Sequence, residues 1–176
     1  MIDFGEGVRL NTLDEIKPPK MREWRNDFSI WKWCRQFDLI TEASHLAWLE
    51  SLKHRDDIRM YSIISSLNQP VGVCGLTDID SLNRRAEFSL YIAPNDQGHG
   101  YAKAALKTLI HHGFSNLGLN CVWGETFDGN HAAKIFESIG FIKEGTRRKF
   151  YFRSGKFIDA HLYSILSSEW TLRDQI

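Results

Sequence analysis

The sequence predicts an α/β fold built around a mixed β-sheet, on the strength of three observations. Several segments alternate apolar and polar residues with the period of half-buried strands, and others repeat apolar residues at helical spacing. The central strands follow one another through short turns, which is typical of antiparallel pairing, whereas the later strands are separated by helices. A glycine-bearing run at residues 97–102 joins the clearest strand to the clearest helix. The chain is expected to form one domain, residues 1–176.

The N-terminal part is predicted to hold one short strand and the first helices. Residues 8–11 form the strand, and a break at Lys17-Pro18-Pro19 precedes a helical turn or two at residues 20–27. Residues 31–37 are strongly aromatic, and their structure is left open. Thr41 is a suitable N-cap for the next helix, which is expected to end near residue 53.

The central part is predicted to be a run of three antiparallel strands. Residues 58–65 and 71–79 are strands on either side of a turn at Asn68-Gln69-Pro70, and residues 84–92 form the third strand. Its alternation turns Glu87 and Tyr91 to the face opposite the one that carries the apolar residues Ala86, Phe88, Leu90 and Ile92.

The C-terminal part alternates helices with strands. Helices are expected at residues 102–114 and 130–139, and Gly140 is a suitable C-terminal cap for the second helix. Strands are expected at residues 120–126, 141–148 and 157–166, with the last two forming a hairpin that turns at Ser154-Gly155.

Composition excludes several classes of partner. Lysine and arginine total 22, as do aspartate and glutamate, so neither nucleic acid nor an anionic membrane is expected as a partner. No apolar run approaches the roughly 20 residues that span a bilayer, and the N-terminus lacks the pattern of a signal peptide. The three widely spaced cysteines, Cys34, Cys74 and Cys121, do not suggest a disulfide framework. A cytoplasmic location is predicted.

The glycine run has the properties of an anion-binding loop. Two glycines let the backbone turn sharply and bring the unpaired N–H groups of a helix start close to a negative charge such as a pyrophosphate. A Walker loop is excluded because Tyr101-Ala102 follows Gly100, and a dinucleotide fingerprint is excluded because Lys103 stands where a small residue is needed. An anion site and an ordinary glycine-bearing loop both remain open on these residues alone.

Two blocks of residues resemble the conserved motifs of the GNAT superfamily of N-acetyltransferases. Gln97-x-x-Gly100-x-Ala102 resembles the loop that binds the pyrophosphate of acetyl-CoA. Asn130-x-x-Ala133, followed by Phe136-Glu137-Ser138-Ile139-Gly140-Phe141, resembles the second block, and a strand separates the two blocks as in the family. The two blocks in this order are specific, and the resemblance covers nearly the whole chain.

Other stretches resemble one branch of the superfamily, which includes the ribosomal-protein alanine N-acetyltransferases. Closer still are the nucleotide-sugar N-acetyltransferases of the pseudaminic-acid pathway. These stretches are Trp24-Arg25-Asn26, Ser44-His45-Leu46-Ala47-Trp48, Val71-Gly72-Val73, Leu76-Thr77-Asp78-Ile79-Asp80 and residues 163–170.

The resemblance implies the GNAT fold, with a mixed, mostly antiparallel sheet of six to seven strands flanked by helices. In the family, acetyl-CoA lies between two strands that splay apart, and it serves as a co-substrate. The residues of this chain that are expected to bind it are Tyr91, Ile92, Gln97, Gly98, His99, Gly100, Tyr101, Ala102, Asn130 and Phe136. Asn130 is equally suited to capping the helix that follows it.

The implied reaction is direct transfer of an acetyl group to a primary amine, and Glu87 is the candidate general base. A carboxylate facing the acceptor groove can accept the proton that an ammonium must lose before attack. Phe136 stands where family members commonly carry a tyrosine that protonates the departing sulfur. Because a thiol has a pKa of about 8.5, the thiolate can leave with little help. Water, Tyr101 or Ser138 could take over this role.

The acceptor is expected to be a nucleotide-linked amino sugar, with Trp24, Arg25 and Asn26 as candidate substrate-binding residues. An aromatic N-terminal segment suits a lid, and Arg25 can bind a phosphate, although core packing and a surface ion pair explain the same residues. The alternatives are a protein N-terminal amine, a polyamine or other small amine, and a non-catalytic acyl-CoA-binding module. An acidic groove at Glu87 would favour a cationic acceptor, and clustered arginines would favour a nucleotide.

No metal is expected, because the sequence holds no His-x-x-x-His or Cys-x-x-Cys pair. A homodimer is compatible with these features.

Overall fold

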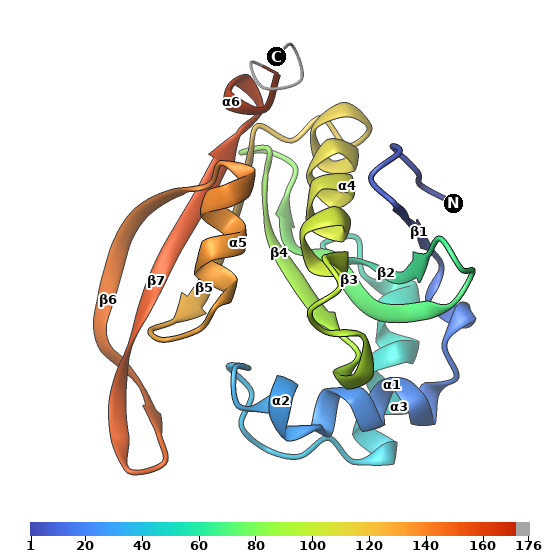
Figure 1. Cartoon of the computed structure of the whole chain (residues 1–176), viewed down its shortest axis with the longest axis vertical. Coiled ribbons are helices and arrows are strands. Elements are labelled where there is room, and N and C mark those ends of the chain that lie inside the picture. Colours follow the sequence, from blue (N-terminus) through green and yellow to red (C-terminus); the bar gives the residue numbers. More distant parts are fainter. Residues whose placement is uncertain (172–176) are drawn as a thin grey trace.

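One seven-stranded sheet organises the computed structural model, which describes residues 1–171 (Figure 1). The last five residues of the predicted domain, 172–176, lie outside the described residues. The strands are β1 (Val8–Asn11), β2 (Arg59–Ser65), β3 (Pro70–Asp80), β4 (Arg85–Ile92), β5 (Cys121–Phe127), β6 (Ile142–Arg153) and β7 (Lys156–Leu166).

The strands lie in the order β1-β2-β3-β4-β5-β7-β6. All neighbouring strands are antiparallel except β4 and β5, which are parallel and are connected through a helix. The predicted mixed, mostly antiparallel sheet is therefore confirmed. Its single parallel junction lies where the sequence places a helix between two strands.

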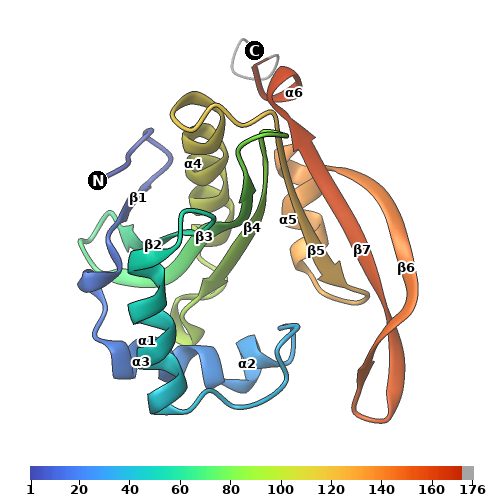
Figure 2. The same ribbon diagram turned by 180° about the vertical axis from the view of Figure 1, so that it is seen from behind.

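Helices cover both faces of the sheet. The α-helices are α1 (Pro18–Asn26), α2 (Phe28–Trp31), α3 (Glu42–Ser51), α4 (Tyr101–Ser115), α5 (Ala132–Ile139) and α6 (Ser167–Thr171). Helices α4 and α5 lie over one face, and α1 and α3 lie on the opposite side (Figures 1 and 2). Short 3-10 helices occur at Leu13–Glu15, Leu52–His54 and Pro94–Asp96.

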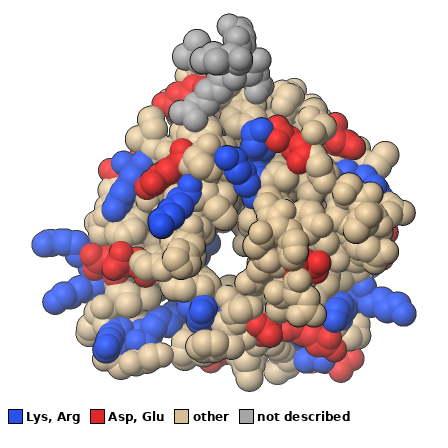
Figure 3. All heavy atoms as spheres, in the orientation of Figure 1, with Lys and Arg blue, Asp and Glu red and all other residues tan. Residues whose placement is uncertain are grey.

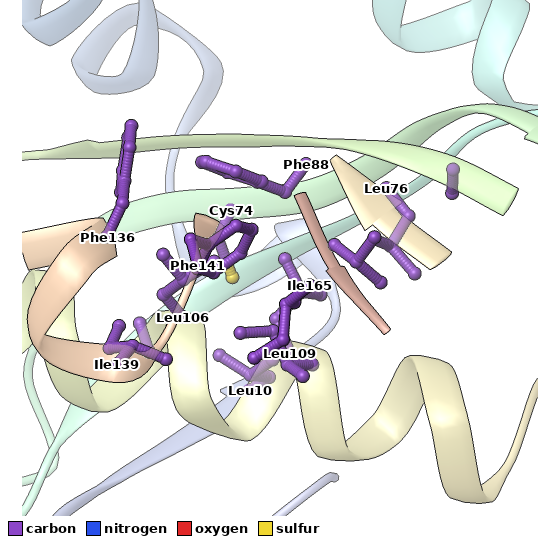
Figure 4. Close-up of a cluster of buried hydrophobic side chains, with 14 of the residues drawn as sticks. Leu10, Cys74, Leu76, Phe88, Leu106, Leu109, Phe136, Ile139, Phe141 and Ile165 are labelled. Carbon is purple, nitrogen blue, oxygen red and sulfur yellow. The ribbon is translucent and has the colours of Figure 1, made fainter. Parts of the chain in front are cut away.

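The larger core lies between the sheet and helices α4 and α5. Leu106 and Leu109 of α4 are fully buried against Leu76 of β3, and Phe88 of β4 packs with Phe136 of α5 (Figure 4). Each such side chain contributes roughly 1.5–3 kcal/mol relative to an exposed one. The apolar face predicted for β4 is thus the face that binds α4 and α5.

A second, smaller core lies on the other face. Met21 and Trp24 of α1 and Ile30 of α2 pack against Val73 of β3, while Tyr91 of β4 lies at the edge of this cluster. The alternation predicted for β4 is confirmed, because Phe88 and Tyr91 belong to different cores.

Helix boundaries follow local chemistry. Thr41 caps α3 as predicted, with its Oγ1 accepting the Ser44 N–H at 3.1 Å. The break predicted at Lys17-Pro18-Pro19 is wrong, because α1 begins at Pro18. Proline is tolerated in the first turn of a helix, where the missing N–H would have no helical partner.

Two features at the C-terminal end differ from the prediction. Strand β6 continues to Arg153 rather than ending at residue 148, and its pairing with β7 shifts between Arg147 and Tyr151. Lys149 has φ 50° inside this irregularity, so the strand bulges there and then continues to the turn at Ser154-Gly155. The short helix α6, which follows β7 directly, was not predicted.

Gly124 of β5 allows β5 to approach Phe88 of β4. A Cβ added at Gly124 would lie 2.3 Å from the Phe88 ring, which is itself packed by Phe136 and Phe141. Phe88 therefore occupies the space that a side chain at position 124 would need.

We predict that Gly124→Ala destabilises the protein by about 1–3 kcal/mol, because the methyl group overpacks a closed aromatic cluster. Gly145→Ala in β6 is the matched control, since a Cβ there meets nothing within 4 Å. Urea unfolding measures both variants. Equal stabilities would contradict the close packing of Phe88 on Gly124.

Candidate active site

The candidate site lies where β4 and β5 part. The two strands pair only between Arg85–Glu87 and Cys121–Trp123, although β4 continues to Ile92 and β5 to Phe127. Strand β5 pairs with β7 along its other side over its full length. In the space-filling view an opening passes through the molecule beside β4 (Figure 3). The inner edges of both strands are therefore left without a strand partner beyond the junction.

The glycine run lies at one end of this gap and begins α4. Gly98 and Gly100 have φ of 84° and 83°, the left-handed region that glycine adopts without strain. Gly100 is the N-cap residue of α4 and offers no side-chain cap. Within the described residues, the backbone N–H groups of residues 98–103 donate to no protein acceptor. The loop thus presents unpaired donors at the positive end of a helix, the arrangement that binds phosphate groups.

Two side chains of the run, those of Gln97 and His99, make hydrogen bonds to neighbouring protein groups. The Gln97 Nε2 lies 3.3 Å from the Ile92 carbonyl and 3.3 Å from the Ser29 hydroxyl, so it joins β4 to α2. The His99 Nδ1 lies 3.3 Å from the Asp96 carbonyl, and its ring stacks beside that of Tyr101.

Glu87 lies at the last residue pair before the strands part. The residue is only 3% exposed, and it points to the face opposite the α4 core. The Arg35 Nη2 lies 2.7 Å from Oε1 and 2.8 Å from Oε2. Burial raises the pKa of the Glu87 carboxyl, and the Arg35 guanidinium opposes this rise. A carboxylate with a raised pKa beside an opening is suited to accepting a proton.

A second buried carboxylate, Glu125, lies on the adjacent strand and faces the same side. Its side chain is 1% exposed, and Arg147 Nη1 lies 2.8 Å from its Oε2. The Tyr151 hydroxyl donates to Oε1 at 2.7 Å. Burial and then this carboxylate raise the pKa of Tyr151, so the phenol remains protonated.

Arg153 closes this side of the site. From the end of β6 its guanidinium donates to the carbonyls of Cys34 and Arg35 in the segment between α2 and α3. The same group lies 4.8 Å from the centre of the Phe37 ring. The Trp31 Nε1 donates to the Phe37 carbonyl at 2.7 Å, which ties the segment to α2. The hairpin and the aromatic segment that the sequence left open are therefore joined across the opening.

The residues predicted to bind the pantetheine arm differ in their distance from the glycine run and in their burial. Ile92 ends β4 next to the glycine run, whereas the Tyr91 side chain points into the smaller core. Phe136 is buried between Phe88 and Tyr163. Asn130 accepts the Ala132 N–H at 3.0 Å through its Oδ1, so its side chain fixes the turn before α5.

The three predicted acceptor-binding residues lie at the end of α1. Trp24 is buried in the smaller core, and Arg25 is half-buried beside it. The Asn26 amide exchanges two hydrogen bonds of 2.8 Å with the backbone of Ile40, so it anchors the segment that carries Arg35. Their contact with an acceptor stays a prediction.

Sequence reasoning missed Arg35, Glu125 and Arg153. Glu125 could have been found, because it shares a strand face with Trp123, the residue that pairs with Glu87. Arg35 and Arg153 carry no local signal, since their roles depend on contacts between distant segments.

Two findings concern the described part of the chain, residues 1–171. No three His, Cys, Asp or Glu side chains in this part gather as metal ligands. None of its helices is long and apolar enough to cross a membrane.

Known proteins resemble this chain in sequence and in structure. The family described as acetyltransferase (GNAT) domain matches residues 8–142. An uncharacterised N-acetyltransferase p20 of Bacillus licheniformis is 33% identical over 134 residues, which cover 76% of this chain and 72% of the relative. The spermidine N(1)-acetyltransferase of Escherichia coli K12 is 30% identical over 156 residues, which cover 87% and 82%.

A structural relative shows the same fold. The spermidine N-acetyltransferase of Vibrio cholerae, solved in complex with CoA and spermine, aligns with a TM-score of 0.85 at 20% identity, over 95% of this chain and 99% of the other.

We predict that Arg153→Ala loosens the segment between α2 and α3. Losing two hydrogen bonds of about 1 kcal/mol each should speed amide hydrogen exchange over residues 32–40 by about tenfold or more. Arg148→Ala, an exposed arginine of the same strand, is the control. Unchanged exchange in the Arg153 variant would show that this contact does not hold the segment.

Proposed function

Because this chain belongs to the GNAT acetyltransferase family and is an N-acetyltransferase that uses acetyl-CoA, we propose that it acetylates a primary amine of a polyamine. The observation that carries the proposal is the pair of buried carboxylates, Glu87 and Glu125, on one face of the parting strands. The three arginines at this face, Arg35, Arg147 and Arg153, are engaged by these carboxylates and by backbone carbonyls, so they are not available to bind a nucleotide phosphate.

The donor site is proposed at the glycine run and the free edge of β4. The unpaired N–H groups of residues 98–103 suit the pyrophosphate, and Ile92 with Tyr91 offers strand-edge groups to the pantetheine amides. The Gln97 side chain would have to release the Ile92 carbonyl for that pairing. Acetyl-CoA supplies the activated acyl group, and the residues of this chain hold it and move the proton.

Glu87 is proposed as the general base. Its carboxylate accepts a proton from the acceptor ammonium, which becomes the neutral amine that attacks. Phe136 has no proton to give to the departing sulfur, and the Ser138 hydroxyl is engaged with the Ile135 carbonyl at 2.8 Å. Tyr101 at the start of α4 is the better placed of the two candidate acids, since it lies in the proposed donor loop itself.

The choice of acceptor rests on relatives and on charge. Two of the proteins described above are spermidine acetyltransferases, whereas none of them is named for a nucleotide-linked sugar. The closeness expected to the pseudaminic-acid enzymes therefore has no support, and the alternative of a polyamine is preferred. The names of the relatives also favour an enzyme over a non-catalytic acyl-CoA-binding module. The homodimer stays a prediction.

We predict that the protein releases CoA from acetyl-CoA faster with spermidine than with nucleotide-linked amino sugars or N-terminal peptides. Glu87→Gln should lower kcat by about 10²–10⁴-fold, because the amide cannot accept the proton. Thiol release measures turnover, and CoA titration checks that the variant still binds the donor. Preference for a nucleotide-linked sugar would reject the acceptor, and an active Glu87 variant would reject the base.

We predict that Gly100→Ala weakens CoA binding by about tenfold. An alanine at φ 83° relaxes toward negative φ and turns the loop N–H groups away, and restoring them costs about 1–2 kcal/mol. Gly7→Ala is the matched control for Gly100→Ala. Gly7 has φ 86° and equally open surroundings, but it lies outside the glycine run. Calorimetric titration with CoA compares them. Equal losses in both variants would remove the glycine run from the donor site.

A further inference from the structure

The Arg35–Glu87 contact joins an irregular segment to the proposed base. One nitrogen of the guanidinium lies within 2.8 Å of both carboxylate oxygens. The carboxylate is buried, whereas the Arg35 side chain is 50% exposed, so the arginine covers Glu87 from the solvent side. An isolated surface ion pair is worth little, but here one partner is desolvated and has its orientation fixed.

Arg35 is itself held in place. Its carbonyl oxygen and that of Cys34 accept hydrogen bonds from Arg153, which also stacks on Phe37. Asn26 fixes the far end of the same segment through the backbone of Ile40. The backbone that carries Arg35 is therefore held on both sides, which limits the positions that its guanidinium can reach.

The other charged groups that face Glu87 are anionic. Asp78 from β3 and Glu125 from β5 both raise the pKa of the Glu87 carboxyl, in the same direction as burial. Arg147 and Tyr151 of β6 are engaged with Glu125. Among the described residues, Arg35 is the cation within hydrogen-bond distance of Glu87.

We propose that Arg35 is a positioning residue for catalysis, which aims the Glu87 carboxylate and keeps it ionised, and that Arg153 acts through it by fixing the segment. The inference rests on the proposed function of Glu87 as the base.

The proton transfer balances without participation of Arg35. An N–H bond of the acceptor ammonium breaks, its electron pair stays on nitrogen, and an O–H bond forms on Glu87. Each carboxylate oxygen has more than one lone pair, so accepting the proton does not require Arg35 to leave. Arg35 remains protonated throughout, and the interaction with Glu87 raises its already high pKa against the effect of burial.

The test is the pH dependence of kcat/KM for spermidine in Arg35→Gln. Activity depends on ionised Glu87, so it falls as the pH drops through the pKa of that carboxyl. Removing the one group that lowers this pKa lets burial, Asp78 and Glu125 act unopposed. The acidic limb of the kcat/KM profile, where activity falls with decreasing pH, should therefore move to higher pH. The expected shift is about 1 pH unit, given the partial exposure of Arg35. The ionisation of the acceptor is common to both enzymes.

Three variants complete the design. Arg35→Lys keeps the charge without the planar fork and should shift the limb less, which also protects the test if the glutamine variant folds poorly. Arg9→Gln removes a partly exposed arginine that bonds to Asn68 from the edge strand β1, which β2 and β3 separate from β4, and it should shift nothing. Arg153→Gln should shift the limb in the same direction, but not further when added to Arg35→Gln.

The outcomes separate the two proposals. An acidic limb that stays in place in both Arg35 variants, while Glu87→Gln is inactive, would overturn the role of Arg35 and leave the base intact. Absence of acetyl transfer by the unaltered protein would reject the proposed function itself. An additive shift in the double variant would show that Arg153 does not act through Arg35.

Discussion

The parting of β4 from β5 after three residue pairs is the constraint on which the rest of the site depends. Backbone N–H and C=O groups along a strand need partners, and a strand that loses its neighbour leaves them open to a ligand. Phe88, packed over Gly124 at the junction, fills the α4 side of the gap with aromatic side chains. The other face, which carries Glu87 and Glu125, is the side proposed for the acceptor. The end of the β4–β5 pairing thus lies beside both the proposed donor site and the proposed acceptor site.

Negative and positive charges are nearly balanced where β4 and β5 part. Glu87 and Glu125 are removed from water, and each is matched by an arginine from a segment that is distant in sequence. Ion pairs with one buried partner are weak evidence for stability, because the desolvation of the carboxylate offsets its attraction to the arginine. Their presence beside an opening is better explained by chemistry, since perturbed carboxyl groups gather where protons are moved. The fold thus accommodates charges that a purely structural core would exclude.

The sheet, most helix positions and the turn at the glycine run could be predicted because their signals are local. Alternation in residues 84–92, Thr41 as a cap and the two glycines of the run each fix structure within a few residues. The N-terminal proline pair was misjudged, since a proline break and a proline helix start share one signal. The acceptor side could not be predicted beyond Glu87. Its geometry depends on Arg35 and Arg153 meeting across the fold, and nothing in either local sequence specifies that contact.

The contact between Arg153 and the Arg35 carbonyl joins residues 118 positions apart. Closing so long a loop carries an entropic cost that is offset only once the intervening strands have assembled. We therefore expect this contact to form late in folding, after the strands and helices that it joins. Contacts made late and few in number are also among the first to open in the native state. The chain can expose its proposed base by a local opening that leaves the rest of the sheet folded.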